Sequence, residues 1–352
     1  MTLRRALPYV DTHAAGEASR VITGNELLAQ GTTMADKLGY AQAHLDWLRQ
    51  LVLHEPRGCP SWCGVLVTAP CDPRADAGIL VMEQAGWRPM SGSNTMCTVT
   101  ALLETGVIPG NGPTKHLTLD TAVGLVEVDA AVENGKVTSV SILNVPSYVN
   151  VLDYPLKVHE LGQVSVDVVF GGQFFAQARA TDLGLELVPE NAPAITRAGA
   201  LIRAAAREQI PVQHPDNPDI ATIDLVMVHG DSPTHDAGGR NAVICVNGEV
   251  DYDRPETWTG SIDRSPCGTG TCGRMAAKHA RGELALGESF IHESLIGSRF
   301  VGHLVEEVEG SVQHAVRPII TGPAWVTGMG KILLDDSDPF PHGYTVADIW
   351  AS

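Results

Sequence analysis

The sequence contains one short loop twice, and this repeat constrains the fold more than any other feature. The first copy is residues 91–95 (Ser-Gly-Ser-Asn-Thr) and the second is residues 267–271 (Cys-Gly-Thr-Gly-Thr). The copies lie 267 − 91 = 176 positions apart, which is half of the 352-residue chain. Each copy opens a helical stretch that ends at a glycine, Gly106 in the first half and Gly282 in the second. We therefore expect a duplicated fold with two similar halves.

Length, composition and charge narrow the class of protein. A chain of 352 residues with 44% hydrophobic and 18% charged residues is typical of a globular protein with two domains. Its net charge of −17 argues against nucleic acid or an anionic membrane as a partner, because both bind basic surfaces. Arg4 and Arg5 are not followed by the apolar stretch of a secretory signal, and the sequence has no run of about 18 apolar residues. We expect a cytoplasmic protein that does not enter the membrane.

The cysteines and the glycine patterns indicate neither a metal nor a cofactor. The seven cysteines are odd in number and scattered, so we expect reduced thiols. Cys59, Cys63 and Cys71 lie near His54, but their spacing fits no common zinc pattern, and they are interpreted as small buried side chains. The sequence has no P-loop and no dinucleotide-binding glycine pattern in the required context.

Short strand-like runs alternate with glycine and proline turns through most of the chain. Strands are predicted at residues 64–68, 78–82, 124–128, 164–169 and 242–246. Helices are predicted at residues 37–53, 95–104, 194–208 and 272–280. Residues 144–155 have the composition of a crossover between the halves, and residues 319–328 are strand-like and fit either half. The pattern predicts an α/β (α+β) fold in which many strands surround few helices.

The second copy of the loop has the composition of a catalytic site. Cys267 is predicted at a helix N-terminus, where the helix dipole lowers the pKa of a thiol from about 8.5 and favours the thiolate base. Asp263 supplies a negative charge that can pair with a substrate ammonium. The backbone N–H groups at the two helix starts can hold a carboxylate. Together these groups predict a small zwitterionic ligand, most simply an amino acid.

Each of these residues also has a purely structural interpretation. Cys267 could be a buried thiol in a tight turn, but packing alone gives no reason to repeat the loop at equivalent positions. Cys97 and Cys272 lie further into their helices and are predicted to be core residues. Asp263 alone would be a turn or capping residue, and His13 fits a turn and a site equally well.

Residues 263–271 (Asp-Arg-Ser-Pro-Cys-Gly-Thr-Gly-Thr) resemble the second signature of the proline racemase superfamily, which includes hydroxyproline 2-epimerases and trans-3-hydroxy-L-proline dehydratases. Further stretches that resemble this family are residues 11–17, 55–58, 75–78, 171–172 and 321–322. The resemblance implies a cofactor-independent enzyme with two strand-rich half-barrel domains of the diaminopimelate epimerase type. Each domain wraps around a central helix, and the active site lies in the cleft between them.

The resemblance also implies domain boundaries and residue roles. Residues 1–155 with 320–352 would form the domain that carries Ser91, since the C-terminal strands usually return to the first domain, and residues 156–319 the domain that carries Cys267. Ser91 and Cys267 would be the acid/base groups on opposite faces of Cα. The residues expected to hold the substrate carboxylate and ring nitrogen are Gly92, Ser93, Gly268 and Thr269 for the carboxylate and Asp263 for the nitrogen. The expected partner is a hydroxyproline, and a homodimer is a possible assembly.

The first loop departs from the racemase pattern and so bears on the reaction. Proline racemases have Cys-Gly-His where this chain has Ser91, Gly92 and Ser93. Racemisation needs proton carriers on both faces of Cα, and a serine hydroxyl is a poor base. β-Elimination needs one strong base, so the sequence favours dehydration of trans-3-hydroxy-L-proline to pyrroline-2-carboxylate.

Four alternatives stay open at this point. One is 2-epimerisation of trans-4-hydroxy-L-proline to cis-4-hydroxy-D-proline, alone or beside dehydration, because a basic carbanion can accept a proton from Ser91. A second is a non-catalytic amino-acid-binding protein that has lost one base. The others are a diaminopimelate epimerase, which Ser91 disfavours, and a thiol peroxidase that uses Cys267 with Cys272 as its resolving thiol.

Overall fold

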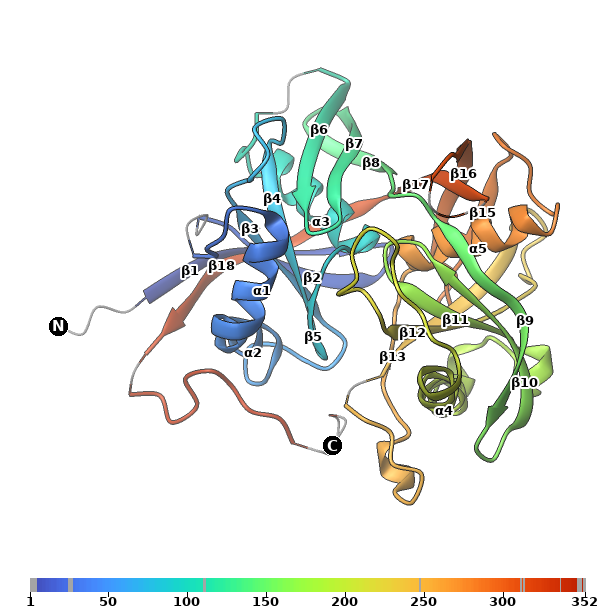
Figure 1. Ribbon diagram of the computed structural model, residues 1–352. Helices are drawn as coiled ribbons and strands as arrows, with labels where there is room; N and C mark the ends of the chain where they lie inside the picture. The colour runs from blue at the N-terminus through green and yellow to red at the C-terminus, as the bar shows by residue number, and fades with distance from the viewer. Residues whose placement is uncertain are drawn as a thin grey trace. The chain divides into compact units, whose positions relative to one another are not determined.

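The computed structural model describes residues 5–24, 28–109, 112–246, 248–310, 312, 314–335, 337–346 and 350. They form a strand-rich α/β structure with few helices, which confirms the predicted fold class (Figure 1). The chain divides into two compact units. The first comprises the described residues up to Ile142 and from Gly322 to Trp350, and the second comprises Leu143–Thr321.

The first unit is built from paired strands and α-helices. Its strands are β1 (Arg5–Ala14), β2 (Glu17–Ile22), β3 (Cys63–Thr68), β4 (Ala77–Glu83), β5 (Gly86–Arg88), β6 (Thr114–Thr121), β7 (Gly124–Glu133), β8 (Lys136–Leu143) and β18 (Ala324–Leu334). Its helices are α1 (Met34–His44), α2 (Asp46–Leu53) and α3 (Gly92–Glu104).

The second unit has the same kinds of element. Its strands are β9 (Tyr148–Val158), β10 (Gly162–Phe170), β11 (Phe174–Arg179), β12 (Ile223–Gly230), β13 (Gly239–Cys245), β14 (Ser261–Ile262), β15 (Phe290–Glu293), β16 (Arg299–Val308) and β17 (Ala315–Gly322). Its α-helices are α4 (Ala192–Gln209) and α5 (Gly268–Ala280), and short 3₁₀ turns lie at Thr181–Leu183, Pro189–Asn191 and Pro255–Thr257.

The strand pairings repeat from one unit to the other. In the first unit β1 pairs antiparallel with β2, β2 parallel with β3, β3 antiparallel with β4, β4 parallel with β6, and β6 antiparallel with β7. In the second unit β10, β11, β12, β13, β15 and β16 pair in the same order and with the same directions. In the first unit, α1 and α2 lie in the connection between the parallel strands β2 and β3. In the second unit, α4 lies in the connection between the corresponding strands β11 and β12. The topology therefore supports the predicted duplication.

The C-terminal strand completes the correspondence. β18 pairs antiparallel with β1 from Arg5↔Leu334 to Ala14↔Ala324. In the second unit β9 occupies the same position beside β10. Thus β18 in the first unit corresponds to β9 in the second. β18 comes from the C-terminal part of the sequence, whereas β9 comes from the start of the second unit.

The two central helices are equivalent residue by residue. α3 and α5 each contain 13 residues, and both of their ends differ by the same 176 positions that separate the loops. Gly106 and Gly282 follow them with φ angles of +73° and +72°, a conformation that favours glycine. Every residue of α3 from Gly92 to Leu103 is buried, so α3 is a core helix.

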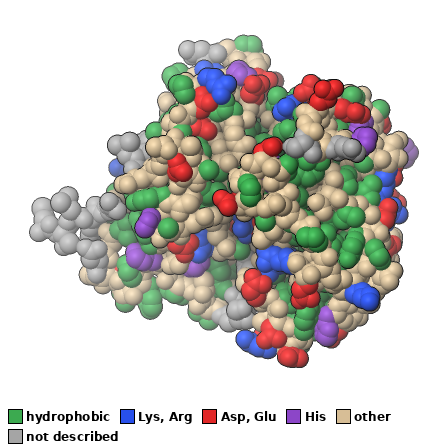
Figure 2. All heavy atoms as spheres, in the orientation of Figure 1, with side chains coloured by type: hydrophobic (Ala, Val, Ile, Leu, Met, Phe, Trp, Pro, Cys, Tyr) green, Lys and Arg blue, Asp and Glu red, His purple; other side chains and the backbone are tan. Residues whose placement is uncertain are grey.

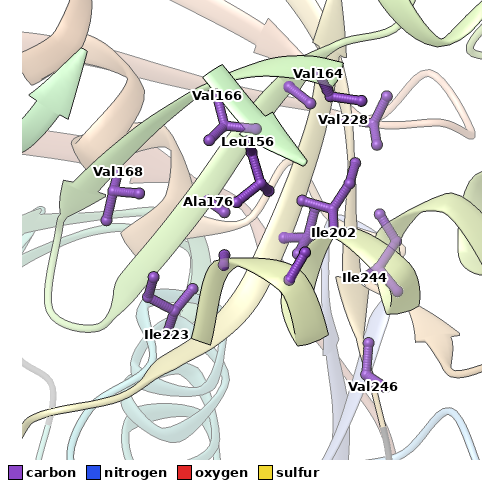
Figure 3. Close-up of a cluster of buried hydrophobic side chains, with 14 of the residues drawn as sticks. Leu156, Val164, Val166, Val168, Ala176, Ile202, Ile223, Val228, Ile244 and Val246 are labelled. Atoms are coloured by element: carbon purple, nitrogen blue, oxygen red, sulfur yellow. The ribbon is translucent and has the colours of Figure 1, made fainter. Parts of the chain in front are cut away.

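The hydrophobic core of the second unit lies on both faces of its sheet. A large cluster around Ile202 of α4 includes Leu156, Val164, Val228 and Ile244 (Figure 3). A smaller cluster on the other face includes Phe175, Met227, Val243 and Cys267. Alternate residues of β11 enter the two clusters, since strand side chains alternate between faces. The smaller cluster carries the candidate thiol.

One prediction of secondary structure was wrong in detail, and the structure refines two others. The single helix expected at residues 37–53 is two helices, because Leu45 (φ −117°, ψ 13°) ends α1 and begins α2. Residues 144–155, predicted as a crossover between the halves, follow the passage from the first unit to the second at Leu143 and are largely strand β9, because Tyr148–Val158 pairs with β10. The strand-like stretch 319–328 is divided between β17 and β18 at Pro323.

On the face drawn in Figure 2, acidic and basic side chains are interspersed with apolar ones. Among the described residues, no helix has both the length and the apolar character needed to span a membrane.

Candidate functional site

Cys267 is the N-cap of α5 and has an unusual backbone. Its side chain is buried, and its φ and ψ are 60° and 115°. Residues other than glycine rarely adopt a positive φ, and such a conformation costs about 1–3 kcal/mol. The surrounding groups must therefore hold the loop in place.

Ser265 links Cys267 to Asp263 through hydrogen bonds. Its hydroxyl accepts the Cys267 N–H at 3.1 Å and donates to Asp263 Oδ1 at 2.8 Å. The Ser265 N–H also donates to Asp263 Oδ1, at 2.8 Å. Asp263 therefore shapes the turn that leads to Cys267. Its predicted contact with the substrate nitrogen stays a prediction.

The carbonyl of Pro266 is held from two sides. Asn241 Nδ2 donates to it at 3.0 Å and Thr271 Oγ1 at 2.9 Å. Thr271 Oγ1 also lies 2.9 Å from Nδ1 of the fully buried His292. Burial, with smaller effects of Arg274 and Lys278, lowers the pKa of His292 to about 3. The ring is therefore neutral at physiological pH and supports the loop.

The sulfur of Cys267 lies beside hydrogen-bond donors at the start of α5. The Gly270 N–H donates to Sγ at 3.4 Å, and Thr269 Oγ1 is 3.8 Å from it. A Cβ at position 270 would lie 3.1 Å from Sγ and 2.8 Å from Met227 Cε, which explains the glycine. Donors at a helix N-terminus stabilise a thiolate, so the geometry suits a thiol base.

The two other helical cysteines are core residues, as predicted. Cys97 and Cys272 are fully buried. Burial raises the pKa of Cys272 to about 12, with a smaller opposing effect of Asn144. A thiol that stays protonated is a poor resolving partner, which disfavours the peroxidase alternative. No disulfide joins the seven cysteines, all of which are described.

Ser91 is the N-cap of α3, but its surroundings differ from those of Cys267. Its backbone is extended, with φ −152° and ψ 127°, and its side chain is buried. Its Oγ accepts a hydrogen bond from Asn94 Nδ2 at 2.9 Å and lies 3.4 Å from Ser93 Oγ. The equivalent loops therefore differ in backbone as well as in sequence.

Both helix starts have backbone N–H groups of the kind that suits an anion. The first backbone pairs are Thr95 N–H to Ser91 O and Thr271 N–H to Cys267 O, each 2.9 Å. The N–H groups of the residues before them, Gly92 and Ser93 in α3 and Gly268 and Thr269 in α5, have no partner within a helix of this geometry. Neither first turn contains an acidic residue. The arrangement suits a carboxylate at either helix start.

His13 is interpreted from the sequence either as a turn residue or as a site residue, and its contacts are those of a turn residue. Its Nδ1 accepts the Gly16 N–H at 3.2 Å, and its ring stacks on Trp325 with 4.9 Å between centroids. Burial, followed by the charge of Lys136, lowers the pKa of His13. A neutral ring that accepts at Nδ1 stabilises the turn between β1 and β2.

The structure groups the predicted site residues by unit. Ser91, Gly92 and Ser93 form one loop, and the second loop contains Asp263, Cys267, Gly268 and Thr269. Sequence reasoning assigned no role to the residues that position these loops, which are Ser19, Asn94, Asn241, Ser265, Thr271 and His292. The signal that could have drawn attention to Asn94 is the repeat itself, since it stands where the second loop has Gly270. Among the described residues, no group of three or more His, Cys, Asp or Glu side chains could hold a metal ion.

Comparison with known proteins gives the family. The proline racemase family matches residues 9–345. The chain belongs to the proline racemase family. Proline racemase of Clostridioides difficile is 39% identical over 345 residues, which cover 98% of this chain and 99% of that protein. The 4-hydroxyproline 2-epimerase of Streptosporangium roseum is 40% identical over 344 residues, with 98% and 99% coverage.

Solved structures of this family have the same fold. A hydroxyproline epimerase of Agrobacterium vitis with bound trans-4-hydroxy-L-proline has a TM-score of 0.91 and 34% identity, and the match covers 99% of this chain and 97% of that one. A probable proline racemase of Agrobacterium radiobacter K84 with bound carbonate has a TM-score of 0.90 and 32% identity, with 98% of each chain covered. A Bacillus anthracis protein of the PhzF family, at 12% identity and a TM-score of 0.56 over 93% of this chain and 99% of that one, shares the fold.

Proposed function

We propose that this protein removes the Cα proton of a hydroxyproline with the Cys267 thiolate, and that its principal reaction is dehydration of trans-3-hydroxy-L-proline to pyrroline-2-carboxylate. The observation that carries this choice is Ser91, which stands where a second thiol would be and whose Oγ already accepts a hydrogen bond from Asn94 at 2.9 Å. A hydroxyl in this state is suited to donate a proton and poorly suited to remove one.

Substrate binding would use the backbone at the two helix starts. The N–H groups near Gly92 and Gly268 would hold the carboxylate, and Asp263 would pair with the ring ammonium. Binding at the carboxylate stabilises negative charge that develops at Cα, and oriented backbone donors do this without reorganisation. The reaction as proposed uses only these groups, Cys267 and Ser91.

In the proposed mechanism, Cys267 Sγ takes the proton of Cα and becomes a thiol. The electron pair of the C–H bond first remains at Cα as a carbanion, which then forms the double bond between Cα and C3 as the C3–O bond breaks. The leaving hydroxide takes the Ser91 proton and departs as water, and solvent then reprotonates Ser91 and accepts the thiol proton. The enamine tautomerises to pyrroline-2-carboxylate, so the net change is loss of one water.

The second candidate function is 2-epimerisation of 4-hydroxyproline. It is favoured by the Streptosporangium roseum relative, which is a 4-hydroxyproline 2-epimerase. The Agrobacterium vitis structure with trans-4-hydroxy-L-proline points in the same direction. Here Ser91 would return a proton to Cα from the face opposite Cys267, because the carbanion is basic enough to accept it. One protein could catalyse both reactions.

The test is proton NMR in D2O with trans-3-hydroxy-L-proline, trans-4-hydroxy-L-proline and L-proline supplied separately. Pyrroline-2-carboxylate from the 3-hydroxy substrate, absent with Cys267→Ala, would support the dehydratase. Inversion with deuterium at Cα of the 4-hydroxy substrate would support the epimerase. Cys272→Ala is the matched control, since it removes a thiol from the same helix without touching the site. Absence of both pyrroline-2-carboxylate and Cα exchange with every substrate would refute the proposal and favour a binding protein.

A further inference from the structure

The two loops supply a hydrogen-bond donor to their reactive atoms in different ways. In the second loop the donor is a backbone group, the Gly270 N–H, at 3.4 Å from Cys267 Sγ. The equivalent position of the first loop, 270 − 176 = 94, is Asn94. Here the donor is the side-chain amide, with Nδ2 at 2.9 Å from Ser91 Oγ.

The Asn94 amide is fixed in this orientation. Ser19 of β2 donates its hydroxyl hydrogen to Asn94 Oδ1 at 2.6 Å. Both side chains are 2% exposed, so water cannot replace either partner. The backbone of Ser19 is itself held, because Thr12 Oγ1 donates to its carbonyl at 2.8 Å. With Oδ1 occupied by a donor, the amide presents Nδ2 to Ser91.

This orientation decides what Ser91 can do with its proton. The Asn94 N–H occupies a lone pair of Ser91 Oγ, so the hydroxyl hydrogen is available for another acceptor. After Ser91 gives up that hydrogen, the Asn94 N–H would hold the negative oxygen by a charge-assisted hydrogen bond, which is stronger than a neutral one. The bond therefore strengthens as the proton leaves.

We infer that Asn94, oriented by Ser19, is a positioning residue that makes Ser91 a donor of a proton and a poor acceptor of one. This inference rests on the proposed function. The alternative is that the two hydrogen bonds of Asn94 serve only to pair its own buried amide group. The two interpretations differ in which chemical step the amide affects, and the isosteric substitution Asn94→Asp separates them. An aspartate at position 94 accepts the Ser91 hydrogen and so withdraws it from the substrate.

The experiment compares Asn94→Asp, Asn94→Ala and Ser19→Ala with wild type, using trans-3-hydroxy-L-proline and trans-4-hydroxy-L-proline in D2O. For Asn94→Asp we expect product formation to fall about 10- to 100-fold, the range for loss of a hydrogen bond to a charged group. Cleavage of the Cα–H bond by Cys267 should persist. Deuterium should therefore enter recovered substrate with retention of configuration, and the ratio of exchange to product should rise by about the same factor. Asn94→Ala and Ser19→Ala should show smaller changes in the same direction.

A second readout does not depend on exchange of the thiol proton with solvent. When proton donation by Ser91 becomes slow, the primary kinetic isotope effect of Cα-deuterated substrate should fall toward one in Asn94→Asp. A merely structural defect would lower both steps together and leave this isotope effect unchanged, and that result would overturn the inference. Unchanged product formation would overturn it as well. If wild type acts on neither hydroxyproline, the proposed function fails first, independently of Asn94.

Discussion

Gly270→Ala tests whether the sulfur of Cys267 needs the space that a side chain at position 270 would fill. The new Cβ would lie 2.8 Å from Met227 Cε, 3.1 Å from Cys267 Sγ and 3.2 Å from Phe175 Cε1. Met227 and Phe175 are completely buried, so they have little room to move. We expect the sulfur to be displaced from the Gly270 N–H.

The matched control is Gly199→Ala in α4 of the same unit. Its Cβ would lie 2.7–2.9 Å from carbons of Ile244, which is comparable crowding away from Cys267. Overpacking costs about 1–3 kcal/mol and replacing a helical glycine by alanine returns about 1 kcal/mol, so each variant should lose up to about 2 kcal/mol of unfolding free energy. Urea denaturation followed by circular dichroism measures this loss.

Activity should separate the two variants. Displacement of a reacting group by about 1 Å can lower the rate about 100-fold, so we expect such a fall in kcat/KM for Gly270→Ala and less than about a twofold change for Gly199→Ala. The substrates are the hydroxyprolines that wild type converts, assayed by NMR. Equal losses of activity in both variants at equal losses of stability would refute a special requirement at Gly270.

Further predictions concern three side chains. Ser91→Cys should raise epimerisation relative to dehydration about 10-fold by supplying a second thiol, measured as the product ratio by NMR; an unchanged ratio would contradict the role given to Ser91. Burial lowers the pKa of His292 from 6.5 to about 3, so the unfolded state binds a proton first as pH falls below 6.5. Stability should then drop by up to about 1.4 kcal/mol per pH unit toward pH 3, and His292→Asn should reduce that slope in urea titrations. The pKa of Cys272 is raised from 9.0 to about 12, so the unfolded state loses its proton first and stability should fall as pH rises from 9 to 12. Cys272→Ala should flatten this decline, and an unchanged slope would contradict it.

The sequence by itself determined the duplication, the fold class and the central loops. The offset of 176 residues between Ser91 and Cys267 also separates the first residues and the last residues of α3 and α5. The repeat could be recognised from the sequence because a backbone position that needs a positive φ favours glycine, as at Gly106 and Gly282. The break of the first predicted helix at Leu45 has no such signal in the sequence, because the apolar periodicity continues across this residue.

The tertiary structure alone decided what surrounds the two reactive atoms. Asn241 and His292 reach the Cys267 loop from β13 and β15, and Ser19 reaches Asn94 from β2, although these residues are far apart in the sequence. Hydrogen bonds of this kind depend on which strands become neighbours, and periodicity along the chain carries no information about that. The same holds for the backbone: Cys267 adopts φ +60° and Ser91 φ −152° at equivalent positions of a repeated motif, because different side chains hold the two loops.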